Sequence, residues 1–409
     1  MTPLGMIVVI VLVDVLGFSI VMPLLGPFAE HYGFEEWRIG LLFAAYPVCQ
    51  LVTGPILGRL SDRYGRRPLL VYSQAGTAVS FVILGLSHDF WVMLLARMLD
   101  GASGGNFLVA QAYVADVTPP EGRSRGLGLM GMAFGMGFVL GPLLGGAILS
   151  LPIAYDLRLR LPFLVAAGFS TAAWILVLAR LPESRDRATA PREHARVLSW
   201  RGLVDTAGLP GVGRLITIGF LGILAFAAFE GTFALFLNRR MGWNERTAAF
   251  AFSGMGVASA VVQGGLIRRL VPRFGEHRLI LAGLSLAAIG FAGLAATSYT
   301  PLLITSMGLL AIGQGLIGPS VGGLLSRTTP RDEQGAVFGV YSSAQTLARL
   351  ISYAIANVML GKIGAGAPYW TSSAVDLTAL AVSVPAAMRA VTALADPQAP
   401  RTEPVSRAS

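Results

Sequence analysis

Apolar runs of about 18 or more residues recur along the whole 409-residue chain, and each is long enough to cross a bilayer. The chain is 54% hydrophobic and 13% charged, whereas a soluble protein carries roughly twice that share of charge. The run within residues 1–28 is a full-length span, so no cleavable signal is expected. The composition predicts an all-α membrane protein.

The apolar runs predict twelve transmembrane helices in two sets of six. The long polar stretch after the sixth run divides the chain into a bundle over 1–181, a linker over 182–213, a bundle over 214–391 and a tail over 392–409. The predicted spans are 4–28, 39–57, 69–86, 90–117, 126–149, 162–178, 215–237, 247–266, 279–297, 301–325, 336–360 and 369–388.

Basic residues give the chain a formal charge of +9, and all but one of the 31 are arginine. They lie in short loops rather than on one clustered face, so membrane topology explains them and no nucleic-acid partner is expected. The loops on one side hold most of the arginines. This bias predicts a multi-pass protein of the cytoplasmic (inner) membrane with both termini in the cytoplasm.

No residue pattern indicates a metal, a cofactor or an enzyme. The only cysteine is Cys49, and the four histidines are scattered without ligand spacing. The G-x-G-x-x-G match at 126–131 opens a membrane helix and follows no strand, so it does not predict a dinucleotide site. No catalytic arrangement of serine, cysteine or histidine is present.

The two halves resemble each other. The sequence at 57–67, LGRLSDRYGRR, aligns with IRRLVPRFGEH at 267–277, an offset of 210 residues. VTPPEGRSRG from Val117 aligns with TTPRDEQG from Thr328 at an offset of 211. Two parallel six-helix repeats with a site between them are typical of secondary transporters.

Ionisable residues inside spans are costly, so each is a functional candidate. Asp14, Arg97, Asp100 and Glu230 are predicted to couple protons. In general, desolvation raises the pKa of a carboxyl group and a nearby arginine lowers it, so moving the arginine can load or release a proton. In the alternative reading, Arg97 and Asp100 merely neutralise each other at i, i+3. Arg349 either forms a structural ion pair or binds an anion in the cavity.

Polar and aromatic residues within the spans are candidates for lining a substrate cavity at the membrane midplane. In the alternative reading, they hold helices together by hydrogen bonds and packing. The predicted cavity residues are Gln50, Asn106, Gln111, Phe134, Phe226, Gln345 and Arg349.

Four motifs in order along the first half carry a resemblance to a known family. They are DVLGFSIVMP at 14–23, GRLSDRYGRRPLL at 58–70, RMLDGASGG at 97–105 and GPLLGG at 141–146. The 58–70 segment is too polar for hydrocarbon and is expected to form a short water-facing turn. Together these motifs resemble the drug:proton antiporter branch of the major facilitator superfamily, and the first half resembles the tetracycline exporters.

The resemblance implies roles for particular residues. Asp14 and Arg97 couple protons, and Asp62 and Arg66 form a cytoplasmic latch with Asp116. The remaining residues assigned by the motifs are Gly58, Arg63, Gly65 and Arg67 in the latch and Gly137, Gly141 and Pro142 in an antiporter hinge. The resemblance also implies a monomer.

The second half departs from the tetracycline exporters. The span 279–297 lacks an acidic residue, the span 247–266 lacks a histidine, and Ser352 and Tyr353 stand where the repeat would place Gly-Pro. Tetracycline–metal chelates are therefore not expected as the main substrate.

The sequence as a whole predicts a proton-coupled exporter of small, partly apolar molecules, with the substrate, protons and the bilayer as its partners. Two other transport functions stay open: export of a lipid or amphipath, and symport of a metabolite. A membrane enzyme or a non-transporting receptor is a remote alternative, because neither a catalytic cluster nor a sizeable soluble domain is evident.

Overall fold

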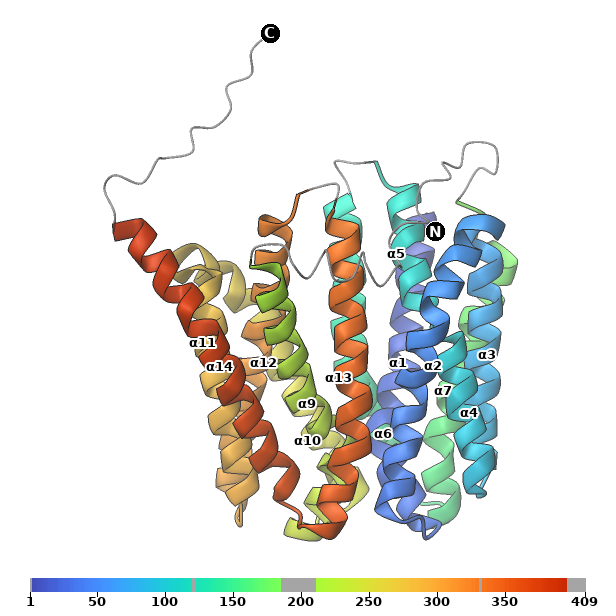
Figure 1. The fold of residues 1–409 in the computed structure, drawn as a ribbon. Helices are drawn as coiled ribbons and strands as arrows, with labels where there is room; N and C mark the ends of the chain where they lie inside the picture. The colour runs from blue at the N-terminus through green and yellow to red at the C-terminus, as the bar shows by residue number, and fades with distance from the viewer. Residues whose placement is uncertain (1, 120–122, 185–210, 331–332, 396–409) are drawn as a thin grey trace.

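The computed structural model describes residues 2–119, 123–184, 211–330 and 333–395, and within these ranges the regular structure is entirely helical. The start of α1 and the end of α14 lie at the same end of the molecule (Figure 1). This end is called the terminal end below, and the opposite one the far end. The predicted linker 182–213 and tail 392–409 lie mostly outside the described residues, so the predicted domain boundaries remain predictions.

Two groups of helices pack side by side (Figure 1). The first contains α1 (Pro3–His31), α2 (Glu36–Tyr64), α3 (Arg66–Leu86), α4 (Phe90–Ser103), α5 (Asn106–Val117), α6 (Arg123–Ile148) and α7 (Tyr155–Arg180). The second contains α9 (Val212–Met241), α10 (Glu245–Val261), the π-helix η3 (Val262–Leu266), α11 (Ile267–Ala296), α12 (Thr300–Thr328), α13 (Gln334–Lys362) and α14 (Ala367–Ala395). We call these groups the first and second bundles.

The described helices make twelve crossings, as predicted, although the crossings and the helices do not correspond one to one. Eight helical segments meet the length and hydropathy that a membrane span requires. The fourth crossing is shared by α4 and α5, and the eighth by α10, η3 and the start of α11. A stretch of π-helix adds one residue to a turn and commonly marks a functional position in a helix.

Two predicted boundaries are wrong. The span predicted over 90–117 is interrupted at Gly104 and Gly105, which separate α4 from α5. The turn predicted over 58–70 is reduced to one residue outside helices, Gly65, because α2 extends to Tyr64 and α3 begins at Arg66. Gly65 has φ 106° and ψ 162°, a conformation that favours glycine because it lacks a Cβ.

The same backbone turn recurs at the predicted repeat offset. Gly275, which lies 210 residues after Gly65, has φ 74° and ψ 156° and bends α11 at the terminal end. The residues that follow the two glycines, Arg66 and Glu276, are both buried. The two halves therefore share a local structure as well as a sequence pattern.

The two bundles meet through α2 and α13, through α6 and α10, and through α1 and α9. Near the midplane Ser253 donates a hydrogen bond to the carbonyl of Val139, at 3.0 Å. At the far end Tyr155 donates to Glu245, at 3.0 Å. Between described residues of the terminal half, no hydrogen bond or ion pair joins the bundles. The polar contacts thus close the far end.

Candidate functional site

The Asp14 carboxylate lies in the middle of α1, among amide groups from two other helices. Its Oδ1 accepts hydrogen bonds from Asn106 Nδ2, at 3.1 Å, and from Gln74 Nε2, at 3.4 Å. Asn106 reaches this position because it is the first residue of α5, directly after the break in the fourth crossing. Both amides are buried, so Asp14 has two fixed donors inside the first bundle.

A second ionisable cluster lies on α4 in the same bundle. Arg97 Nη1 and Asp100 Oδ2 are 2.7 Å apart, and the two residues are 1% and 3% exposed. Arg97 Nε also donates to the Leu42 carbonyl at 3.3 Å, and its guanidinium lies 5.1 Å from the centre of the Tyr46 ring. The pairing predicted at i, i+3 is present, whereas the coupling role of these residues remains a prediction.

The predicted ionisable residues of the second bundle form a cluster of their own. Arg349 Nε lies 3.5 Å from Glu230 Oε2, and Tyr353 donates a hydrogen bond to the same oxygen at 3.0 Å. Of the two readings of Arg349, the geometry is that of an ion pair. Its side chain is still 31% exposed while that of Glu230 is 5% exposed, so the arginine retains access to solvent or a ligand.

The Tyr353 ring lies 5.4 Å from that of Phe43 in the first bundle. On the first-bundle side of this contact region, Tyr46 stands beside Arg97. The two ionisable clusters therefore face each other across the contact between α2 and α13.

Aromatic rings form a continuous row through the first bundle. Phe138 lies between Phe18, at 6.2 Å, and Phe134, at 5.0 Å, measured between ring centres. The row continues from Phe134 to Phe107 at 5.6 Å and from Phe18 to Tyr46 at 5.6 Å. Phe134 is 40% exposed, so one member of the row presents an open face.

The other predicted cavity residues lie at varied places. Gln50 donates to the Gly104 carbonyl, at 3.1 Å, and therefore binds the backbone where the fourth crossing is broken. Phe226 stacks on Phe229 at 5.8 Å. Gln111 and Gln345 are half-buried. Contact with a substrate remains a prediction for all of these residues.

The predicted latch residues come together around one arginine. Arg66 Nη1 lies 2.8 Å from Asp62, and its Nε lies 3.0 Å from Asp116 at the end of α5. Glu183 accepts hydrogen bonds from the backbone N–H groups of Arg66, at 2.8 Å, and Arg67, at 3.2 Å. Because these N–H groups begin α3, the carboxylate caps a helix N-terminus, which favours a negative charge.

Other latch residues differ in their surroundings. Arg67 Nη2 donates to the Leu178 carbonyl at 2.7 Å, which ties the turn to α7. Arg63 is exposed and lies against Tyr64, and Gly58 lies near Leu108. Glu183 was not predicted, because it is distant in sequence from the motif and nothing local indicates its role as a cap.

The predicted hinge glycines form a close contact between α1 and α6. A Cβ on Gly141 would overlap Ser19 Oγ, and one on Gly137 would lie 2.7 Å from Val15 Cγ1. Ser19 Oγ donates to the Gly137 carbonyl at 2.7 Å. The α6 helix continues through Pro142. The glycines thus allow the two backbones to touch, and bending at this point remains a prediction.

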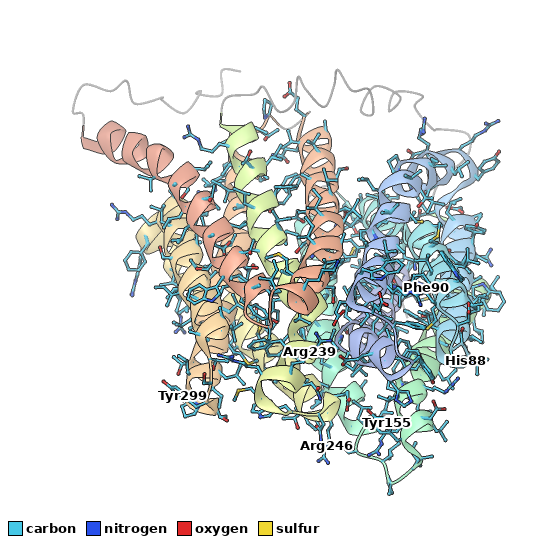
Figure 2. The ribbon with its side chains drawn as sticks, turned by 60° about the horizontal axis from the view of Figure 1, so that its bottom comes forward. His88, Phe90, Tyr155, Arg239, Arg246 and Tyr299 are labelled. Carbon is cyan, nitrogen blue, oxygen red and sulfur yellow. The ribbon has the colours of Figure 1, made fainter. Side chains whose placement is uncertain are left out.

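Two features of the structure were not predicted. Asp376 in α14 is 0% exposed, and neither of its carboxylate oxygens has a hydrogen-bond partner in the described structure. At the far end, Arg239 of the second bundle lies 2.7 Å from Glu30 and 3.1 Å from Glu36 of the first. Figure 2 shows Arg239 and Tyr155 near the line where the bundles meet, with His88 and Tyr299 at opposite margins.

Paired helical bundles with ionisable side chains buried near their contact define a secondary transporter of the membrane. The sequence pattern of the Major Facilitator Superfamily matches residues 7–401. The chain therefore belongs to this superfamily of multi-pass membrane transporters, and it is a transporter rather than an enzyme.

Individual relatives agree with the family. The class C tetracycline resistance protein of Escherichia coli is 31% identical, over 82% of this chain and 84% of the relative. Multidrug resistance protein 1 of Bacillus subtilis (strain 168) is 27% identical, over 90% and 92%. The structure of the human organic anion transporter MFSD10 shares the fold, with a TM-score of 0.72 and 24% identity over 93% of this chain and 98% of that one. The predicted twelve-helix major facilitator fold is confirmed.

Proposed function

We propose that this protein exports small, partly apolar molecules across the cytoplasmic membrane in exchange for protons. The observation that carries the proposal is the Asp14 carboxylate, held by Asn106 and Gln74 inside the first bundle. The names of the tetracycline and multidrug resistance relatives support drug export as the direction and type of transport.

Asp14 is the residue proposed to carry the exchanged proton. Both N–H donors bind Oδ1 and stabilise the ionised form, and the second carboxylate oxygen, Oδ2, is the atom to which a proton can be added while these hydrogen bonds persist. Arg97 is already paired with Asp100, so its charge is not directed at Asp14 in this state. A movement that separates Arg97 from Asp100 changes the electrostatic potential at Asp14. The affinity of the Asp14 carboxylate for a proton changes with it.

The substrate site is proposed to lie between the bundles, near the aromatic row and the Glu230–Arg349 pair. Aromatic rings bind flat apolar molecules, and the partly exposed Arg349 provides a polar contact that fixes their orientation. With the far end closed by Arg239 and Tyr155, the site is reached from the terminal end in this state.

The arginine bias of the loops supports a cytoplasmic terminal end, with both termini inside the cell. Substrate then enters from the cytoplasm in the state observed and leaves when the far end opens. The cluster around Arg66 is proposed to act as a latch, because its ion pairs connect α2, the start of α3 and the end of α5. The protein is proposed to work as a monomer.

The test is substrate-triggered proton movement in proteoliposomes that hold a preset pH gradient. A panel of cationic, neutral and anionic aromatic drugs, with tetracycline included, is added to vesicles containing the purified protein. Collapse of the gradient by at least one compound, absent from protein-free vesicles, supports drug:proton exchange. No response to any compound, from a preparation shown to be folded by its unfolding transition, contradicts the proposal.

A further inference from the structure

A basic patch lies at the terminal end of the second bundle, where α10 and η3 run into α11. Arg268, Arg269, Arg273 and Arg278 are all exposed, and together they form what we call the second-half arginine patch. Arg269 and Arg273 are four residues apart, which places them on one helix face about 6 Å apart along the axis. Arg278 follows the turn at Gly275.

The internal repeat provides a direct comparison for this patch. At the offset of 210 residues, Arg269 and Arg273 correspond to Arg59 and Arg63, which are equally exposed. The other positions differ in charge. Arg268 corresponds to Gly58, Arg278 to Pro68, and Pro272 to Asp62. Arg66 and Arg67 in turn correspond to Glu276 and His277. Each stretch therefore carries four arginines and one carboxylate, and the two halves differ in where these charges lie and in the carboxylates that neighbouring segments bring to them.

Carboxylates neutralise the two regions to different extents. In the first half, Asp62 and Asp116 pair with Arg66, and Glu183 caps the helix that begins there. In the second half, the buried Glu276 pairs with Arg327, a fifth arginine, at 3.1 Å. Among the described residues, no ion pair involves the four arginines of the patch. Within the part of the chain that the structure describes, the patch thus presents a positive surface with no carboxylate paired to it.

Apolar side chains accompany the arginines. Phe274 is 50% exposed and Leu266 is 40% exposed. Leu266 is the last residue of η3, and Phe274 directly precedes the bend at Gly275. Arginines beside exposed apolar groups at the end of a span match the boundary between lipid headgroups and acyl chains. A soluble anion would use the charge alone and leave these apolar groups in water.

We propose that the second-half arginine patch binds the phosphodiester headgroup of an anionic phospholipid, with Phe274 and Leu266 against the adjoining acyl chain. Arginine suits this ligand because its planar guanidinium donates two parallel hydrogen bonds to phosphate oxygens. The first half, whose arginines are largely balanced by carboxylates, binds such a lipid weakly. This proposal is independent of the transported substrate.

The test measures binding of phosphatidylglycerol to the full chain in detergent by native mass spectrometry. The variant Arg269→Gln/Arg273→Gln is compared with the matched pair at the same repeat positions, Arg59→Gln/Arg63→Gln. Each arginine near an anionic surface contributes about 1 kcal/mol, so the second-half variant raises the dissociation constant about 30-fold. The first-half variant changes it less than about threefold, and zwitterionic phosphatidylcholine binds equally to all three proteins.

Several results would overturn the assignment. Equal weakening by both double variants would mean that the repeats bind lipid alike. Equal binding of phosphatidylglycerol to wild type and to Arg269→Gln/Arg273→Gln would mean that the lipid does not bind at the second-half arginine patch. This result is expected if an acidic segment of the same chain occupies the patch. Full displacement of the lipid by millimolar inorganic phosphate would identify a free-anion site instead. Unchanged unfolding midpoints in phosphatidylcholine show that both variants are folded.

Discussion

Arg327 at the end of α12 lies 3.1 Å from Glu276, the residue that follows the bend in α11. The first half contains the same relationship with the charges exchanged, since Arg66 lies 3.0 Å from Asp116. The partners are displaced by 210 and 211 residues, which are the offsets of the sequence repeat. Both halves thus have an ion pair at this place, but the basic and acidic residues have exchanged positions.

The reversed pair predicts a result for charge exchange. Glu276→Arg places two cations together, and Arg327→Glu places two carboxylates together, so each single variant lowers the thermal unfolding midpoint. The double variant restores attraction. Because the Arg327 side chain is 69% exposed, solvent screens the pair and the coupling energy is about 0.5–1 kcal/mol. A double-mutant cycle measures it, and strictly additive effects would contradict the pairing.

The buried pair Arg97–Asp100 predicts a larger effect. Asp100→Asn leaves a buried arginine without its counterion, which costs about 3–5 kcal/mol of unfolding free energy. Replacing both residues, as Arg97→Met/Asp100→Leu, removes the unpaired charge and recovers most of that loss. Chemical unfolding in detergent micelles checks both values. If the double variant were as unstable as Asp100→Asn, the unpaired buried charge of Arg97 would not be the cause of the instability.

The contact between α1 and α6 predicts a steric effect with an internal control. Gly141→Ala places a methyl group against Ser19 Oγ and Gly135→Ala places one in open space, since nothing lies within 4 Å of that position. Both residues are in α6, so helix propensity changes equally. Gly141→Ala is expected to lower the unfolding midpoint and the transport rate, whereas Gly135→Ala is expected to raise the midpoint slightly through its better helix propensity and to leave the transport rate unchanged. Equal behaviour of the two variants would exclude the close contact.

The ion pairs of Arg239 are expected to favour states in which the far end is closed over states in which it is open. Arg239→Gln removes attraction to Glu30 and Glu36 and so favours states with the far end open. Spin labels on cysteines replacing the exposed His88 and Tyr299, with Cys49 replaced by serine, report the distance across that end (Figure 2). In Arg239→Gln, the distribution of distances between the two spin labels is expected to shift to longer values. The exposed Arg246, replaced by glutamine, is the control, and equal shifts in both variants would argue against a specific lock.

Sequence reasoning predicted the features that depend on local pattern. Apolar length located the twelve crossings, and the repeat aligned the two segments in which the turns at Gly65 and Gly275 lie. The family resemblance implied that Asp62 and Asp116 are partners of Arg66, and the structure places both carboxylates in contact with that arginine, while the latch role remains a prediction. These predictions worked because each depends on residues close in sequence or on a strongly patterned motif.

Features that depend on the packing of distant helices were missed. Asn106 was predicted to line the cavity, but only the fold brings it, together with Gln74, to Asp14. The contact of Arg239 with Glu30 and Glu36 joins helix ends about 200 residues apart in the sequence. Asp376 is a different case, because a carboxylate inside an apolar span is visible in the sequence and the cost of burying it marks it as a candidate.

Proton flux driven by substrate, compared between wild type and Asp14→Asn, tests the central claim most directly. Asparagine keeps the size of the side chain but cannot exchange a proton, and Asp14→Glu serves as the titratable control. In proteoliposomes with a preset pH gradient, the account predicts that an active compound collapses the gradient in wild type, that Asp14→Glu retains part of this response, and that Asp14→Asn loses it while still binding the compound. An undiminished collapse in Asp14→Asn would show that Asp14 does not carry the exchanged proton.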